Sequence, residues 1–271
     1  MIKVTNIGYD LTEFNYTSDI HLDSIENSLD NMGEVINSLT SNVQKTDTLI
    51  IMGDFANNNE YTERFLEEIH KYFKLVIITD GNHDSYFDKQ SGKLEYKINR
   101  LKKAIEPIEN IIFLEPETSI LEFNNGIRLA GCNLWYDLDN PNALWDFNNI
   151  QDKRYIDYGY IIEKSKEHKD FYNKVINDID IFVSHVPVVN QHFDTFGDGC
   201  FYRRLGLYSH KIYLFGHMHE GYCEHLKAMN TFLLTKPIGY NMSNNKKIGY
   251  FNMEEFIKIK ERITDDGGID K

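Results

Sequence analysis

Residues 74–84 read KLVIITDGNHD, an apolar run that leads into a glycine-containing loop. The apolar run is typical of a buried β-strand. The loop carries Asn82, His83 and Asp84, whose side chains can bind a metal ion or transfer a proton. A loop of this kind is also consistent with an ordinary turn, so its meaning depends on the rest of the chain.

Four other apolar runs end in the same way, in side chains able to bind a metal. Strand ends are where α/β folds build sites, because the loops converge there while the sheet holds their bases rigid. One such ending alone is consistent with a turn or a helix cap. Five endings that contain five of the ten histidines favour a shared site. The other four are Asp19-Ile-His21, Gly53-Asp54, Ser184-His185 and Gly216-His-Met-His219.

The last of these endings lies in residues 215–221, FGHMHEG. His217 and His219 are two residues apart, which places both imidazoles on one side of an extended segment. Two neighbouring nitrogen donors suit a transition metal. Taken alone, the motif is equally consistent with two solvated histidines in a turn.

The pattern of hydrophobic residues predicts alternating strands and helices. Strands are expected within 14–19, 47–54, 74–84, 180–187 and 211–219, and helices within 24–43, 60–73, 93–105 and 160–177. A hairpin is expected over 119–135 with Asn125-Gly126 as its turn, and strand-like runs follow at 231–235, 247–253 and 256–263. The polar and aromatic stretch 136–160 carries no predicted element. The chain shows no repeat or linker, so we expect one α/β domain over residues 1–271 with a frayed end at 264–271.

Composition and targeting signals indicate a globular protein in a reducing compartment. The chain is 41% hydrophobic and 26% charged, which is ordinary for such proteins. It contains no run of about 18 apolar residues, so no membrane span is expected. The first residues do not resemble a signal peptide, and the three cysteines match neither a zinc site nor a disulfide framework. We therefore expect a cytoplasmic protein.

The net charge of −13 bears on possible partners. A surface this acidic repels phosphate backbones and disfavours non-specific binding of duplex nucleic acid. Bound divalent cations would make the field of a site positive while the outer surface stays acidic. The sequence does not determine the oligomeric state.

The ordered set D-x-H, G-D, G-N-H-D, S-H and G-H-x-H, spanning residues 19–219, resembles the calcineurin-like metallophosphoesterase superfamily. The stretches GCNLWYD and KPIGY are similar to a bacterial and phage branch of it. This resemblance implies a four-layer α/β/β/α sandwich with a dinuclear metal site at the strand ends. It also implies a metal-dependent hydrolase of phosphoric esters.

The resemblance assigns a role to each motif residue. One divalent metal would be held by Asp19, His21, Asp54 and His219, and a second by Asp54, Asn82, His185 and His217, with Asp54 bridging. Mixed nitrogen and oxygen ligands suit manganese, iron, zinc or nickel, of which we expect manganese. A hydroxide bridging the metals would attack phosphorus. His83 would protonate the leaving group, Asp84 would orient His83, and Gly216 would allow close backbone approach.

Substrate contacts are predicted from residues near the motifs. Arg203 and Arg204 could bind a phosphate or carboxylate, because guanidinium matches such groups bidentately, although a solvated helix start is the plainer interpretation. His192 could line the entrance or lie on the surface. Trp135 and Tyr136 could stack on a base or sugar, although aromatic residues after a strand are more often core.

These features lead to one principal functional hypothesis and several alternatives. We expect a phosphodiesterase that acts on a small or nucleotide-like substrate. A phosphomonoesterase is the first alternative, and it includes phosphoprotein phosphatases, from whose GDxVDRG motif the GDFANN of residues 53–58 departs. A nuclease is another. A non-catalytic binding module on the same fold is disfavoured because every proposed ligand position is intact.

Overall fold

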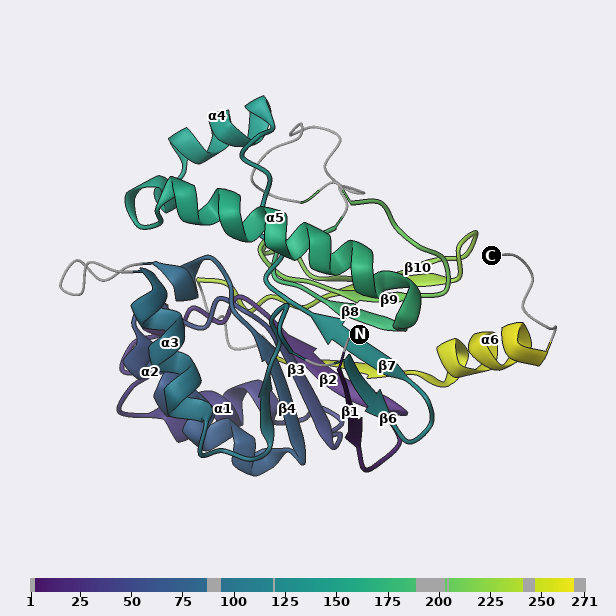
Figure 1. Cartoon of the computed structure of the whole chain (residues 1–271). Coiled ribbons are helices and arrows are strands. Elements are labelled where there is room, and N and C mark those ends of the chain that lie inside the picture. Colours follow the sequence, from purple (N-terminus) through teal and green to yellow (C-terminus); the bar gives the residue numbers. More distant parts are fainter. Residues whose placement is uncertain are drawn as a thin grey trace.

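Two β-sheets lie between layers of helices in this computed structural model (Figure 1). The structure describes residues 3–86, 94–118, 120–188, 203, 205–240 and 247–265. Helices α1, α2 and α3 lie on one side, and α4 and α5 lie on the other.

The five-stranded sheet has the order β12-β2-β3-β4-β5. Neighbouring strands from β2 to β5 are parallel, whereas β12 is antiparallel to β2. Its outer face packs against the helices through Ile36, Phe65 and Leu101, together with Ile51 and Ile78 of the sheet. The elements are β2 (Glu13–Thr17), β3 (Thr48–Met52), β4 (Leu75–Thr79), β5 (Ile111–Phe113), β12 (Gly249–Asn252), α1 (Met32–Thr40), α2 (Asn59–Ile69) and α3 (Leu94–Ile105).

The seven-stranded sheet has the order β1-β6-β7-β8-β9-β11-β10. Helix α5 covers its outer face, where Phe171 and Tyr172 pack with Phe182 and Tyr213. The central strands β7, β8, β9 and β11 are parallel to one another. The elements are β1 (Val4–Ile7), β6 (Ile120–Phe123), β7 (Arg128–Gly131), β8 (Ile181–Val183), β9 (Ile212–Leu214), β10 (Tyr222–Leu226), β11 (Thr231–Thr235) and α5 (Tyr158–Val175).

The inner faces of the sheets form a shared apolar core. Ile50 and Ile77 of one sheet belong to the same buried cluster as Val183 and Leu214 of the other. All five residues of β3 and of β4 are buried, because one face meets the helices and the other meets the second sheet. The predicted four-layer α/β/β/α architecture is therefore confirmed.

Segments 136–160 and 256–263 differ from the prediction. Stretch 136–160, which carried no predicted element, contains α4 (Pro141–Asn149) and a 3₁₀ helix (Gln151–Arg154). Asn140 caps α4 and Pro141 begins it, a start signal that was present in the sequence. The strand-like run 256–263 is instead part of α6 (Glu254–Asp265), which places Phe256 in the core between the sheets.

The hairpin agrees with the sequence prediction, and the first helix is shorter than predicted. The predicted hairpin is formed by β6 and β7, with Gly126 at φ 72° in its turn. The first predicted helix is shorter than expected, since α1 begins only at Met32. Trp135 and Tyr136 are both buried, as core aromatic residues would be.

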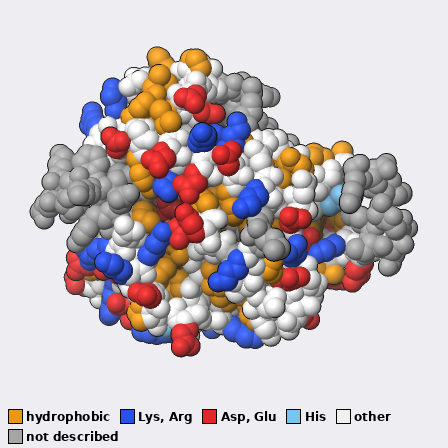
Figure 2. Space-filling model, viewed as in Figure 1, with side chains coloured by type: hydrophobic (Ala, Val, Ile, Leu, Met, Phe, Trp, Pro, Cys, Tyr) orange, Lys and Arg blue, Asp and Glu red, His pale blue; other side chains and the backbone are white. Residues whose placement is uncertain are grey.

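On the face shown in Figure 2, acidic and basic side chains are interspersed, and apolar side chains gather over α4. Trp145 of α4 is among the exposed large hydrophobic residues. None of the helices in the described ranges is both long enough and apolar enough to cross a membrane.

Candidate metal centre

The polar loops that follow five strands meet at one place between the two sheets. Neighbouring strands β2, β3 and β4 lead into Asp19 and His21, into Asp54, and into Asn82 and His83. Neighbouring strands β8 and β9 of the other sheet lead into His185 and into the pair His217 and His219. The structure thus brings together all seven predicted ligands and His83.

The backbone around these side chains is strained. Positive φ angles occur at Asp19 (50°), His21 (47°), Asp54 (57°), His217 (71°) and His219 (56°). Side chains with a Cβ rarely adopt this left-handed conformation, and such strain gathers at functional sites. The surrounding packing therefore stabilises these loops in conformations that would be unfavourable in an isolated chain.

Close backbone approach is confirmed at Gly216. A Cβ built on this glycine would lie 2.8 Å from Oδ2 of Asp19 and 2.9 Å from the carbonyl oxygen of Met52. Gly81 is equally constrained, because a Cβ there would lie 2.1 Å from Oδ1 of Asp54. A larger side chain at either position would displace a predicted ligand.

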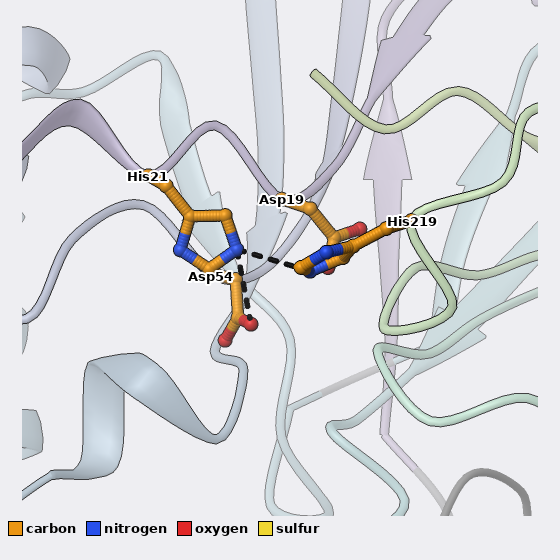
Figure 3. A group of neighbouring side chains, drawn as sticks. All are labelled: Asp19, His21, Asp54 and His219. Atoms are coloured by element: carbon orange, nitrogen blue, oxygen red, sulfur yellow. Dashed lines mark hydrogen bonds and ion pairs between the residues drawn. The ribbon is translucent and has the colours of Figure 1, made fainter. Parts of the chain in front are cut away.

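The first group contains Asp19, His21, Asp54 and His219 (Figure 3). One ligand atom from each of the four lies within 4.8 Å of the others. The two Nε2 atoms of His21 and His219 are 3.1 Å apart, and Nε2 of His219 is 3.3 Å from Oδ1 of Asp19. Both oxygens of Asp19 accept from the His217 amide, which fixes that carboxylate.

The second group centres on His185. Its Nδ1 lies 2.7 Å from the Met52 carbonyl oxygen, so Nδ1 carries a proton and donates it. Nε2 of the neutral ring would then be an acceptor, yet it faces Oδ1 of Asn82 at 2.9 Å and Oδ2 of Asp54 at 3.4 Å. Nδ1 of His217 approaches the same Asn82 oxygen at 3.1 Å. Convergent buried lone pairs of this kind require a second proton on His185 or a bound cation.

The charges of the side chains in the site support this interpretation. Burial alone would lower the pKa of His185, but neighbouring Asp54 raises it to about 10. Burial would raise the pKa of Asp54, but His185 and His83 hold it well below its usual range. Burial lowers the pKa of His21 and of His217 to about 4, which leaves both rings neutral and able to bind a metal at neutral pH.

Asp54 connects the two groups. Its Oδ1 accepts the backbone N–H of His83 at 2.9 Å. Its Oδ2 lies 3.9 Å from Nε2 of His21, on the side of the first group, and 3.4 Å from Nε2 of His185. These nitrogen and oxygen donors therefore fit divalent transition metals, with one carboxylate available to both groups.

His83 lies beside this cluster with its ring fixed by Asn57. Nδ1 of His83 is 2.8 Å from Oδ1 of Asn57, and Nδ2 of Asn57 donates to Asp23 at 2.6 Å. The Asp23 contact orients the amide, so the His83 Nδ1 is the donor. Nε2 of His83 lies 4.0 Å from Oδ2 of Asp54, which places it next to the candidate metal positions.

The contacts of Asp84 correct the prediction that it orients His83. Its carboxylate accepts backbone N–H groups of Asp54 at 2.8 Å, Phe55 at 3.0 Å and Gly81 at 2.8 Å. A buried carboxylate satisfied by backbone amides joins two loops. Asp84 thus fixes the backbone that carries Asp54, and Asn57 takes the predicted role at the ring.

Tyr240 and Asp152 also contact site residues and, like Asn57 and Tyr86, were not predicted. Tyr240 is 47% exposed, stacks on His21 with ring centroids 4.0 Å apart, and places its hydroxyl 3.1 Å from Nε2 of His83. Asp152 is buried and accepts from Nδ2 of Asn82. Tyr240 ends the KPIGY stretch, which is similar to the bacterial and phage branch but carried no predicted site role, whereas no local pattern distinguishes Asp152.

Of the three predicted substrate-binding residues, the structure describes only Arg203. Arg203 is only 3% exposed, and its guanidinium contacts the Ser165 hydroxyl, the Trp135 carbonyl at 3.4 Å and the Asp137 carboxylate at 3.5 Å. These contacts correct the prediction, because they join Arg203 to the protein interior. His192 and Arg204 lie outside the described residues, and their roles remain predictions.

Comparisons with known proteins agree with this geometry. The family model for calcineurin-like phosphoesterases matches residues 14–221. The chain is 24% identical over 213 residues to the UPF0046 protein T07D4.2 of Caenorhabditis elegans, covering 65% of this chain and 46% of that protein. It thus spans about half the length of this curated relative.

The fold is also similar to a solved structure. A phosphopantetheinyl hydrolase from Mycobacterium tuberculosis superposes with a TM-score of 0.64 at 16% sequence identity, over 84% of this chain and 89% of that one. At this identity the likeness concerns the fold alone. The family model covers most of the chain and includes every strand-end motif, so the chain belongs to the calcineurin-like phosphoesterases, a family of metal-dependent hydrolases of phosphoric esters.

Proposed function

We propose that this protein is a phosphodiesterase that uses two divalent cations and acts on a small or nucleotide-like substrate. The principal observation is the position of the Asp54 carboxylate, whose Oδ2 is approached from one group by His21 and from the other by His185. A single carboxylate between one group of histidines with Asp19 and another of histidines with Asn82 can serve both cations of a pair.

Each group would hold one cation. Asp19, His21, Asp54 and His219 would bind the first, and Asp54, Asn82, His185 and His217 would bind the second. The mixed nitrogen and oxygen donors accept manganese, iron, zinc or nickel, and manganese is the cation proposed here. When bound, the cations would neutralise phosphoryl charge and lower the pKa of the attacking water.

His83 would deliver the proton to the leaving oxygen. The Nδ1–H group of His83 remains hydrogen-bonded to Asn57. The proton available for transfer is therefore the one on Nε2 of the protonated ring. Tyr240 and Tyr86 place hydroxyl groups 3.1 Å and 3.3 Å from this nitrogen. The Tyr86 hydroxyl, whose own proton goes to Asp152, would accept from Nε2–H and keep the ring in place, and the Tyr240 hydroxyl would hydrogen-bond to the leaving group.

The charge of the described site favours a diester over a monoester. Apart from the Asp54 carboxylate, the side-chain groups described next to His83 Nε2 are the hydroxyls of Tyr86 and Tyr240, and Arg203 is directed to Asp137 instead. A diester carries one negative charge where a monoester carries up to two, so it needs fewer cationic side chains. The diester is therefore the better match to these residues.

Hydrolysis of two chromogenic esters tests the proposal. Protein loaded with Mn²⁺ is assayed on bis-p-nitrophenyl phosphate and on p-nitrophenyl phosphate, with EDTA-treated protein and His83→Ala as controls. Preference for the diester, lost in both controls, supports the proposal. Preference for the monoester indicates a phosphomonoesterase, and no turnover of either with two metals bound would argue for a non-catalytic role.

A further inference from the structure

We infer that Asp152 is a positioning residue that sets the orientation of the Asn82 amide and thereby builds the second cation site. This inference rests on the proposed two-cation function. Asp152 lies on the 3₁₀ helix Gln151–Arg154, which directly follows α4 and contains none of the family motifs.

The Asn82 amide has two ends of nearly equal shape and opposite hydrogen-bonding character. Its Nδ2 lies 3.2 Å from each oxygen of Asp152. Its Oδ1 points the other way, to Nε2 of His185 and Nδ1 of His217. A rotation that exchanged the ends would place Oδ1 against a carboxylate and an N–H group toward the cation. The Asp152 carboxylate therefore determines which end faces the metal position.

Asp152 is itself held in place by two phenols. The Tyr86 hydroxyl donates to its Oδ1 at 2.5 Å and the Tyr136 hydroxyl to its Oδ2 at 2.6 Å. The carboxylate is 3% exposed and both tyrosines are buried. Three donors on a buried carboxylate leave it little freedom to move, and hydrogen bonds to a charged acceptor are the stronger kind.

The surrounding packing explains why this carboxylate is rigid. Phe147 of α4 and Ile156 belong to the same buried cluster as Tyr86 and Tyr136. Apolar and aromatic residues of segment 136–160 thus pack into one buried cluster beside the Asp152 carboxylate. That carboxylate contacts Asn82 of the second cation group, and its hydrogen bonds reach none of Asp19, His21 or His219. A change at Asp152 should consequently affect one cation and spare the other.

Binding of Mn²⁺, followed by the electron paramagnetic resonance of the free ion and by calorimetry, tests this without an activity assay. Asp152→Asn is expected to weaken one of two Mn²⁺ equivalents by about 10–100-fold, the usual effect of losing a partner behind a metal ligand. In the double variant Asn82→Asp with Asp152→Asn, the asparagine at 152 can donate from its NH₂ group to the aspartate at 82. This restores a hydrogen bond between the two positions. It should recover affinity to within about 10-fold of wild type. Asp146→Asn on α4 is the matched control and should bind as wild type does.

Each other outcome has a defined meaning. Two Mn²⁺ with unchanged affinity in Asp152→Asn would overturn the inference and leave the proposed function standing. Loss of both equivalents without recovery in the double variant would also overturn it, since Asp152 would then serve general folding. Fewer than two Mn²⁺ per wild-type chain would overturn the proposed function, and this inference with it.

Discussion

Nδ1 of His83 lies 2.8 Å from Oδ1 of Asn57, so an amide orients the ring beside the cation groups. The Asn57 amide is in turn held by Asp23, which accepts from its Nδ2. This chain of contacts involves no carboxylate in direct contact with Nδ1. Asn57 is therefore the residue whose loss should misdirect His83 without removing it.

Asn57→Ala is expected to lower kcat on bis-p-nitrophenyl phosphate by about 10-fold or more, with KM little changed. General acid catalysis contributes roughly 10²–10⁴-fold, and a misdirected ring should forfeit part of that factor. Asn58→Ala is the control, because Asn58 caps α2 through Glu60 and makes no described contact with His83. An unchanged kcat in Asn57→Ala would refute this role.

Asp84→Asn should mainly lower stability. The Asp84 carboxylate accepts hydrogen bonds from backbone N–H groups through both of its oxygens. An asparagine has only one acceptor oxygen, so its NH₂ group would face some of these N–H donors. Each buried donor left without a partner costs about 1–3 kcal/mol, so the free energy of unfolding should fall by about 3 kcal/mol. Denaturant unfolding of metal-free protein measures this, with the exposed Asp139→Asn as control. Normal stability with a large fall in kcat would restore the original view of Asp84 as the residue that orients His83.

Cation binding should depend on pH through His185. Asp54 raises the pKa of His185 to about 10, despite the opposing effect of burial, so a proton occupies this site in the metal-free protein. A cation must displace that proton, and the apparent affinity for Mn²⁺ should rise by up to about 10-fold per pH unit below that value. Calorimetric titrations at several pH values would show it. An affinity independent of pH would contradict the assignment of His185 as a ligand.

The same raised pKa affects the stability of the metal-free protein. Folding raises the His185 pKa above its ordinary value of 6.5, so the protonated ring stabilises the native state. This contribution is fully present below that ordinary value and is lost as the pH rises through about 10. Thermal melts of EDTA-treated protein should show a His185→Gln variant losing the alkaline decline.

Tyr240 should contribute to substrate binding. Its ring stacks on His21 and its hydroxyl contacts Nε2 of His83, while nearly half of its surface is exposed. Tyr240→Phe removes one hydrogen bond and should lower kcat/KM by about 2–10-fold. Tyr240→Ala also removes the ring and should lower it further. Tyr158→Phe, at an exposed tyrosine of α5, is the matched control, and equal effects in both would argue against a site role.

The core strands and the motif residues could be predicted because short, continuous stretches of the sequence identify them. Strands β3 and β4 are short apolar runs, and their ligands follow directly in the chain. Asp152 could not be predicted in this way, since its partners Asn82 and Tyr86 lie 70 and 66 residues earlier in the chain. Only the packing of 136–160 against the site creates that contact.

The wrong predictions have physical causes as well. In residues 256–263 the alternation of apolar and charged residues resembles a strand, but Met253 and Phe256 are also at helical spacing and both enter the core between the sheets. Asp84 follows His83 directly, yet its carboxylate serves backbone amides. The position of Asp84 next to His83 in the sequence therefore did not indicate the direction in which its carboxylate points.

Five of the predicted ligands have a left-handed backbone conformation, which lowers the stability of the fold while it positions side chains needed for activity. Each conformation costs about 1–2 kcal/mol for a residue with a Cβ, and natural domains are stable by only about 5–15 kcal/mol in total. Glycine would relieve the strain at any of these positions and abolish a ligand at the same time. Directed evolution for heat resistance alone should therefore enrich glycine at Asp19, His21, Asp54, His217 and His219, and select inactive proteins. Retention of these aspartates and histidines requires selection for activity.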